Sequence, residues 1–410
     1  MSEWKEVSLG DFCSIGSSKR IFYSEYTEAG VPFWRSKEVI VQHDGGVIGD
    51  PLYISEERYA ELEKYGYPSE GDLLLTSVGT IGVPYLVKAN DRFYFKDGNL
   101  TWFKDFSESL DSKFLYLFLE SRLGQSRLEG LLIGSSQKAL TISALNTLQI
   151  PLPPIETQKR IAEILFKYDE LIESSRRQIA LLEEAAHRLY KEWFVDLRFP
   201  GYETTPIHDD LPEGWGKGSL FDLCMPIRGC SYSSEEVECG EGTLVNLGNL
   251  APYGGFRFGY EKPFSGKCRD DQLISKGDVF IGLTEQAKGL AGYAALIPAV
   301  PKGSVISADL MRLIPFEGVS SAYLYGLLRF GRLSDELSPL ANGTKIKHLR
   351  PDAIARVGFA IPPIPLINKY TDLVSPCFEK VSGLEEQIAS AREARDRLLP
   401  KLMSGEIEVV

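Results

Sequence analysis

The sequence predicts an α+β fold in which two similar mixed α/β domains are joined and separated by two long helices that pair as an antiparallel coiled coil. Segments recur at a nearly constant offset, since the motif starting at Trp4 returns at Trp215 and the one starting at Gly134 returns at Gly343, 211 and 209 residues later. After each copy, apolar residues recur every seven positions, which is the period of a coiled-coil seam. The chain is therefore predicted to be a pseudo-two-fold internal repeat.

The offset divides the chain into equivalent parts. Each copy has a globular part that ends in a double proline, and a helical part that follows it, because proline has no amide hydrogen to continue the preceding element. The predicted parts are a first globular domain at 1–154, a first helical region at 155–198, a linker at 199–213, a second globular domain at 214–363 and a second helical region at 364–410.

Within the globular parts, short apolar runs bounded by glycine and proline predict strands, as in the equivalent segments Asp72–Thr76 and Asp278–Gly282. Runs rich in leucine and aromatic residues predict helices at Lys113–Leu123 and Ala322–Leu333. Both copies thus have the same predicted order of strands followed by a helix.

Each helical region carries one apolar seam, interrupted only by a polar Ser175 and a charged Arg395. The first seam consists of Ile161, Leu165, Tyr168, Ile172, Ser175, Ile179, Leu182, Ala186, Leu189 and Trp193. The second consists of Tyr370, Val374, Cys377, Val381, Leu384, Ile388, Ala391, Arg395, Leu398 and Leu402. Matched seams predict that the helices pack together, with Ile179 and Leu182 near Leu384–Ile388. The alternative is that each helix packs only on its own domain.

The composition is that of an ordinary globular protein. Of 410 residues, 43% are hydrophobic and 25% charged, which excludes a disordered or collagen-like chain. No apolar run is long enough to span a membrane, and the charged start Met1–Glu6 lacks the apolar region of a secretory signal. The cysteines form no C-x-x-C pair, which argues against a zinc site or disulfide framework and favours a cytoplasmic location. They are Cys13, Cys224, Cys230, Cys239, Cys268 and Cys377.

No catalytic motif is present. The sequence lacks G-x-x-x-x-G-K-[ST], G-x-S-x-G and H-E-x-x-H, and no Asp or Asn of the adenine-methyltransferase type precedes the double prolines. The potential metal ligands in His208–Asp210 and Glu235–Glu238 are interpreted as solvated turns, and the equivalent residues Cys13 and Cys224 as small core residues. We therefore expect no catalytic site, metal or cofactor in this chain.

The net charge of −12 opposes nucleic-acid binding, because contacts of Lys and Arg with phosphate supply much of that affinity. An acidic protein that binds DNA must gather its cations on one face or use those of a partner. Two related domains held apart nevertheless suit duplex DNA, whose half-sites are separated by helical turns. Because the two copies have diverged, each is expected to read a different half-site.

Several motifs resemble those of the specificity (S) subunits of type I restriction–modification systems. They are Ala139–Leu145 running into Ile150–Ala162, the linker signature Leu211–Trp215 and the terminal segment Leu398–Ile407. The resemblance covers the whole chain and implies two target recognition domains and two conserved helical regions. One departure is Pro365–Lys369, which replaces the sequence found at Glu156–Arg160, so partner docking there is expected to differ in detail.

The resemblance also implies a non-catalytic role. Such a subunit binds double-stranded DNA at a bipartite asymmetric sequence and directs a methyltransferase (modification) subunit and a restriction/translocase subunit to it. S-adenosylmethionine, ATP and Mg²⁺ are then expected on those partner subunits, and none in this chain. No membrane partner is expected.

Candidate DNA-contacting residues lie in loops rich in glycine, hydroxyl groups and cations. Arg reads guanine and Asn or Gln reads adenine, while Lys, Ser and Thr contact the backbone. The candidates are Lys19, Arg20, Arg35, Lys37, Thr80, Ser135, Ser136, Gln137 and Lys138 in the first copy, and Arg228, Asn246, Gln286, Lys288, Thr344, Lys345 and Lys347 in the second. For the chain as a whole, two alternatives to DNA recognition stay open. One is a coiled-coil scaffold protein with two protein-binding heads, and the other is an enzyme with an unrecognised site.

Overall fold

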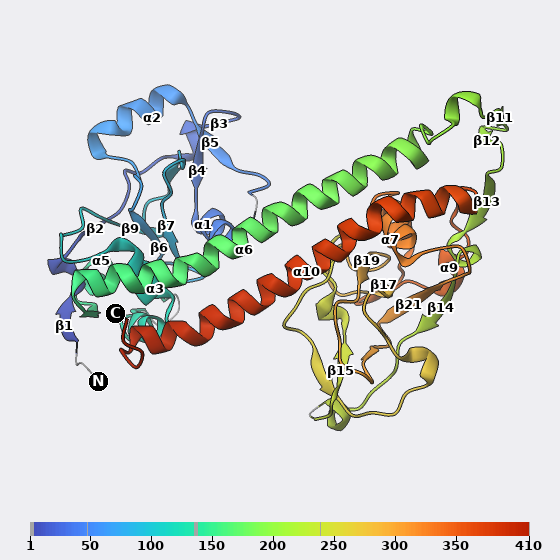
Figure 1. The fold of residues 1–410 in the computed structure, drawn as a ribbon. Coiled ribbons are helices and arrows are strands. Elements are labelled where there is room, and N and C mark those ends of the chain that lie inside the picture. Colours follow the sequence, from blue (N-terminus) through green and yellow to red (C-terminus); the bar gives the residue numbers. More distant parts are fainter. Residues whose placement is uncertain (1–3, 47, 135–137, 238, 410) are drawn as a thin grey trace. The chain divides into compact units, whose positions relative to one another are not determined.

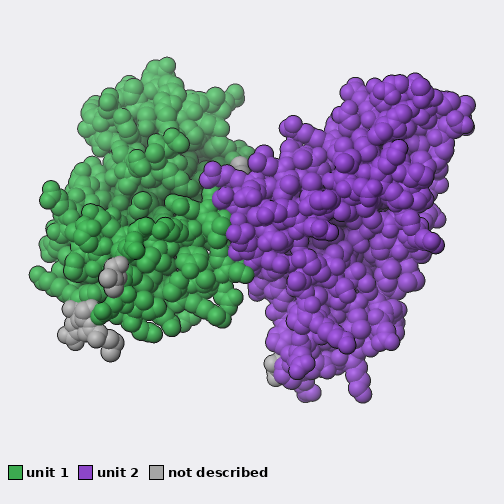
Figure 2. Space-filling model, in the orientation of Figure 1, with its two compact units in different colours: residues 1–173, 390–410 green, residues 174–389 purple. Residues whose placement is uncertain are grey.

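The computed structural model describes residues 4–46, 48–134, 138–237 and 239–409. Two compact units share the chain (Figure 2), one formed by Met1–Glu173 with Ser390–Val410 (unit 1) and the other by Ser174–Ala389 (unit 2). Each unit therefore contains one globular domain and part of each of the two long helices (Figure 1).

Unit 1 is built on two small sheets and a two-stranded ladder. Neighbours in the first sheet are antiparallel, whereas β4 and β8 in the second are parallel. The first sheet has the order β2 (Ser14–Gly16), β9 (Leu100–Lys104), β6 (Leu73–Thr76), β7 (Pro84–Leu86). The second has the order β3 (Tyr26–Thr27), β5 (Leu52–Ile54), β4 (Val31–Trp34), β8 (Tyr94–Phe95). In the ladder, β1 (Lys5–Ser8) pairs with β10 (Gln149–Leu152), which ties the start of the domain to its end.

The helices in the second half of this domain bury their apolar residues against the first sheet, whereas Leu62 lies in a core with Phe33 and Ile54 of the second. Phe114 and Phe118 share a core with Leu73 and Phe103. The single helix predicted at Lys113–Leu123 is wrong in its extent, because the Ser121 hydroxyl accepts the Gly124 N–H and begins a new helix. The helices are α1 (Ser36–His43), α2 (Glu56–Leu62), α3 (Ser112–Glu120), α4 (Arg122–Gly130) and α5 (Ile142–Asn146).

Unit 2 repeats this plan. Its main sheet has the order β14 (Cys224–Arg228), β21 (Leu310–Pro315), β17 (Val279–Gly282), β19 (Ala294–Leu296). Its second sheet has the order β16 (Lys262–Phe264), β15 (Gly242–Val245), β20 (Val305–Ile306), and β13 (Gly216–Ser219) pairs with β23 (Gly358–Ile361). The helices are α7 (Ser321–Arg329), α8 (Leu333–Leu337) and α9 (Pro351–Ile354), and the short strands β11 (Ile207–His208) and β12 (Leu211–Pro212) form a hairpin before β13.

The strand registers confirm the internal repeat. Leu73 of β6 lies opposite both Leu86 and Phe103, and its equivalent Val279 of β17 lies opposite both Leu296 and Leu313. The parallel pairs also correspond, since β4 pairs with β8 as β15 pairs with β20. A one-residue slip would reverse the face of every side chain, so equal registers require the same inside-out pattern in both copies.

The long helices α6 (Ile155–Tyr190) and α10 (Ile364–Met403) pack antiparallel, as the seams predicted. In unit 1, Ile161 and Leu165 near the start of α6 share a core with Leu402 near the end of α10. In unit 2, Tyr190 at the end of α6 packs edge-on against Tyr370 near the start of α10. Every predicted seam position is buried or half-buried. The alternative, in which each helix packs only on its own domain, is therefore wrong.

The charged exception in the seam has a partner. In unit 1, Arg395 donates from Nη1 to the Asp169 carboxylate at 2.6 Å. The repeat-equivalent positions in unit 2 are Ala186 and Phe378, which both lie in the apolar core. One end of the α6–α10 pair thus contains an ion pair where the other contains apolar side chains. The predicted approach of Ile179 and Leu182 to Leu384–Ile388 stays a prediction.

The cysteines Cys13 and Cys224 are buried, as predicted. Their thiols take the same place in both copies, since Cys13 Sγ donates to Leu9 O and Cys224 Sγ donates to Leu220 O. Burial raises the pKa of both thiols to about 12. They therefore act as small core residues rather than as nucleophiles.

Candidate nucleic-acid interface

Five segments of each copy meet where the central strand β6 or β17 ends, and we call this region the candidate edge. In unit 1 the Ser77 N–H donates to Asn99 O at 2.8 Å, and the Leu140 N–H donates to Ser77 O at 3.0 Å. In unit 2 Leu283 takes the place of Ser77 and makes the same bonds, from its N–H to Asp309 O and from the Leu349 N–H to its carbonyl, both at 2.7 Å. The candidate edge comprises residues 17–20, 35–38, 77–80, 97–100 and 138–140 in unit 1, and 228–230, 246–249, 283–289, 307–310 and 342–349 in unit 2.

Arg35 and Lys37 lie at the N-terminus of α1, and both cations approach the buried carboxylate of Glu38. Glu38 is 1% exposed and accepts the Arg35 backbone N–H at 2.8 Å and its Nη2 at 2.6 Å, while Lys37 Nζ lies at 3.4 Å. Burial alone would raise the pKa of Glu38, but the hydrogen bonds from Arg35 hold it below its usual value. Arg35 is therefore fixed by the fold, and Lys37, which is 58% exposed, has the freer cation.

Lys19 and Arg20 lie beside the β8–β9 connection. The Ser18 hydroxyl, next to Lys19, donates to Phe95 O at 2.7 Å, and Arg20 Nε pairs with Asp97 at 2.7 Å. Arg20 is 66% exposed, so this pair contributes little to stability and can exchange its carboxylate for another anion. Sequence reasoning missed Asp97, which partly neutralises this part of the edge.

Thr80 and Lys138 come together through the Val78–Ala139 bridge. Both are exposed. The remaining candidates of this loop, Ser135, Ser136 and Gln137, lie outside the described residues.

In unit 2 the equivalent contact is a short ladder, in which β18 (Thr284–Glu285) pairs with β22 (Lys347–His348). The ladder brings together two exposed loops, and the Glu285 carboxylate anchors one of them by accepting the N–H groups of Gly289, Leu290 and Ala291 at 2.9, 3.1 and 2.6 Å. The exposed candidates in these loops are Gln286, Lys288, Thr344, Lys345 and Lys347. The structure therefore places five of the seven candidates of this copy side by side.

Asn246 and Arg228 occupy other positions on the same edge. Asn246 stands where unit 1 has Arg35, and Asn249 where it has Glu38: the Asn246 N–H donates to Asn249 Oδ1 at 3.0 Å. The Asn246 amide is already used, by Gly248 N–H and Tyr260 O. Arg228 is exposed and donates from Nε to Ala308 O at 3.0 Å. In both copies the side chain three residues further on, Glu38 or Asn249, caps the turn by accepting that backbone N–H.

Of the two motifs interpreted as solvated turns, the first is exposed throughout, whereas in the second Glu235 is exposed, Glu236 is half-buried and Glu238 lies outside the described residues. His208, Asp209 and Asp210 are exposed, and the two aspartates adopt left-handed backbone angles of φ 47° and 63° at the tip of the β11–β12 hairpin. Among the described residues, no group of His, Cys, Asp or Glu is arranged to hold a metal ion. Nor does any described helix have the length and apolar character needed to cross a membrane.

Comparisons with known proteins agree with the fold and with the motifs. Residues 1–184 match the family model of the type I restriction modification DNA specificity domain. The chain is 26% identical to the type I restriction enzyme MjaIX specificity subunit of Methanocaldococcus jannaschii, over 99% of this chain and 94% of that protein. It is 22% identical to the type I restriction enzyme HindI specificity subunit of Haemophilus influenzae, over 99% and 100%.

Among solved structures, the S subunit of a type I restriction–modification system from M. genitalium shares the fold. It matches 97% of this chain and 96% of its own length, with a TM-score of 0.62 at 16% identity. The first copy with its long helix thus matches the model of a DNA specificity domain, and the repeat makes the second globular domain its structural counterpart. Over its whole length the chain is similar to the specificity subunits of type I restriction–modification systems, which confirms the resemblance that the motifs predicted.

Proposed function

We propose that this chain is the DNA-recognition subunit of a type I restriction–modification enzyme, and that its two domains bind the two halves of a bipartite asymmetric target. One observation carries the proposal. The candidate edge has the same backbone hydrogen bonds in both copies but different exposed side chains, with Thr80 replaced by Gln286 and Lys37 by Gly248. A shared frame that presents different donors and acceptors is what two half-sites of different sequence require.

The chain itself does no chemistry in this proposal. It directs a methyltransferase subunit, and a restriction/translocase subunit where one is present, to the sequence that its domains select. Those partners carry S-adenosylmethionine, ATP and Mg²⁺. They also supply cations that a chain of net charge −12 lacks, since phosphate contacts dominate the affinity for duplex DNA. We place the assembled enzyme in the cytoplasm, where all six cysteines stay unpaired, as they are in the structure.

A scaffold protein with two protein-binding heads is not favoured. The first copy matches a DNA specificity domain, and a scaffold has no need for it.

The proposal is tested by methylome sequencing. The chain is expressed with its methyltransferase subunit in a host that lacks both, and methylated adenines are mapped genome-wide. We expect methylation at one bipartite asymmetric sequence, absent when this chain is omitted. Methylation that is identical with and without the chain would overturn the proposal.

A further inference from the structure

Tyr253 is an exposed aromatic residue held in an unfavourable backbone conformation beside the candidate edge of unit 2. Its φ is 65°, in the left-handed region that residues with a side chain rarely adopt, and Gly254 and Gly255 follow at φ 100° and 98°. The Tyr253 side chain is nevertheless 53% exposed. Strain of this kind persists only where surrounding contacts enforce it, and such residues gather at binding sites.

Two hydrogen bonds fix the Tyr253 backbone. Its N–H donates to Gly289 O at 2.7 Å, and its carbonyl accepts Nη1 of Arg329 at 2.9 Å. The Tyr253 ring meets the ring of Tyr293 edge-on, with centroids 5.5 Å apart. Gly289 has a φ of 90°, and a Cβ there would lie 3.0 Å from Tyr253 N and 3.1 Å from its ring, so a side chain at this position would be strained. Tyr253 is therefore packed directly against the Gln286–Gly289 loop that carries Lys288.

Arg329 links this tyrosine to the long helix. Its Nη2 donates to the Glu183 carboxylate of α6 at 3.0 Å, and the two side chains are 22% and 25% exposed. Arg329 thus spans from α6 to the Tyr253 carbonyl within unit 2. A cation so placed sets where the tyrosine loop lies relative to the helix.

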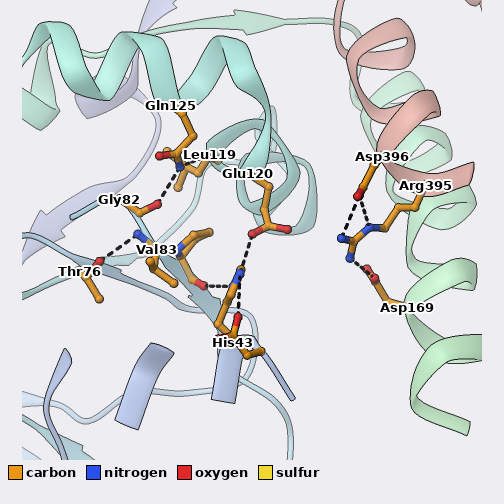
Figure 3. A network of polar contacts seen from close by, with 12 residues as sticks. His43, Thr76, Gly82, Val83, Leu119, Glu120, Gln125, Asp169, Arg395 and Asp396 are labelled. Atoms are coloured by element: carbon orange, nitrogen blue, oxygen red, sulfur yellow. Dashed lines mark hydrogen bonds and ion pairs between the residues drawn. The ribbon is translucent and has the colours of Figure 1, made fainter. Parts of the chain in front are cut away.

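The same junction exists in unit 1 with other chemistry (Figure 3). Glu120 is the repeat equivalent of Arg329, and it pairs with Nε2 of His43 at 3.3 Å, while His43 Nδ1 lies 3.0 Å from Pro84 O. A glycine pair also follows this loop in unit 1, where Asp44 precedes Gly45 and Gly46 as Tyr253 precedes Gly254 and Gly255. Both copies tie this loop to the last residue of α3 or α7, but only the second presents an aromatic ring there.

We propose that Tyr253 contacts DNA as part of the second candidate edge, and that Arg329 is the positioning residue that holds it there. This rests on the proposed function. An exposed ring next to Lys288 can pack on the apolar groups that duplex DNA offers in its grooves, the thymine methyl group and the sugar, while Lys288 meets the phosphate. Because Asp44 precedes the glycine pair in the first copy, the contact distinguishes how the two half-sites are bound.

The test uses the full chain assembled with its methyltransferase subunit and a labelled duplex that carries the methylated sequence. A duplex of equal length with one half-site scrambled is the reference, each half in turn. Tyr253→Ala leaves φ equally strained and removes only the ring. We expect it to weaken binding to the intact duplex by roughly tenfold, because an apolar contact with the thymine methyl group or the sugar is lost. We expect little change with the duplex in which the half-site of unit 2 is scrambled. Tyr253→Phe, which keeps the ring, restores the affinity. Tyr202→Ala, at a 42% exposed tyrosine in the linker, is the matched control and binds as the parent does.

Arg329 is tested through a double-mutant cycle. Arg329→Lys keeps a cation beside Glu183, and Glu183→Gln releases Arg329 from α6 as a second route. If Arg329 acts through Tyr253, either change combined with Tyr253→Ala weakens binding no further than Tyr253→Ala alone. Additive losses would assign Arg329 a structural role only and overturn its part in the proposal.

The outcomes separate this inference from the proposed function. A parent enzyme that binds intact and scrambled duplexes equally contradicts the proposed function itself. A parent enzyme that discriminates between them, together with a Tyr253→Ala variant of undiminished affinity, leaves the function in place and overturns the contact by Tyr253.

Discussion

Replacing Arg395 with alanine is expected to destabilise unit 1, and the structure sets the magnitude. Arg395 pairs with Asp169 at 2.6 Å and with Asp396 at 3.1 Å, and the Arg395 and Asp169 side chains are 26% and 30% exposed. Removing one partner of a fully buried pair costs about 3–5 kcal/mol, whereas an exposed pair contributes about 0–1 kcal/mol. This pair lies between those limits, so we expect a loss of about 2 kcal/mol in the free energy of unfolding.

Unit 2 indicates how to repair the loss. Its equivalents of Arg395 and Asp169 are Ala186 and Phe378, so the double variant Arg395→Ala/Asp169→Phe installs the apolar chemistry of the second junction in the first. Since apolar replacement of a buried pair is often neutral, the double variant should regain most of the lost stability. Urea unfolding of the full chain, followed by circular dichroism, measures both. An Arg395→Ala variant as stable as the parent, or a double variant as unstable as the single one, would refute this reasoning.

Three further predictions concern the candidate edge, a buried carboxylate and the cysteines. Lys138→Ala and Lys347→Ala should each weaken DNA binding by the assembled enzyme to a similar extent on all sequences. Each should also reduce the slope of log affinity against log salt concentration by about one unit. Titrations at two salt concentrations that show no change for either variant would place these loops away from DNA. Burial and the nearby Glu183 raise the pKa of Glu385 to about 7, above its ordinary value. The contribution of protonated Glu385 to folding stability is therefore fully present below about pH 4.5 and is lost as the pH rises through 7. Glu385→Gln should be more stable than the parent at pH 8 by about 1–3 kcal/mol, and equal stability in urea at pH 8 would contradict this. A thiol reagent at pH 8 should modify the exposed Cys239 well before the buried Cys13, as mass spectrometry of the native chain would show; equal rates would mean that the first domain opens readily.

Much of the fold could be predicted from the sequence because each element predicted in one copy could be compared with its equivalent in the other. The offset near 210 residues located the equivalent strands Leu73–Thr76 and Val279–Gly282, and the seven-residue period located the α6–α10 pair. Helix ends were less predictable, because the helix break at Ser121 depends on one hydroxyl that caps α4.

The candidate edge was predictable in outline and not in its internal contacts. Glycine, hydroxyl groups and cations marked its loops, but Arg35 and Asn246 proved to be engaged by Glu38 and Asn249 through contacts of local geometry. Tyr253 carried no signal in the sequence beyond the two glycines after it, because its strain arises from Gly289 and Arg329, residues distant along the chain.

The different contacts at the two ends of the α6–α10 pair make the pairing of these helices selective. If two copies of α6 met in this register, each Asp169 carboxylate would face Ala186 of the other and lose its counter-ion. Two copies of α10 would set Arg395 against Phe378. Pairing of α6 with α10 is therefore favoured over pairing of either helix with a second copy of itself, because only the mixed pair joins Asp169 to Arg395. The two halves of the chain are therefore complementary but not interchangeable. If two chains exchanged halves, each assembly would still need one α6 and one α10.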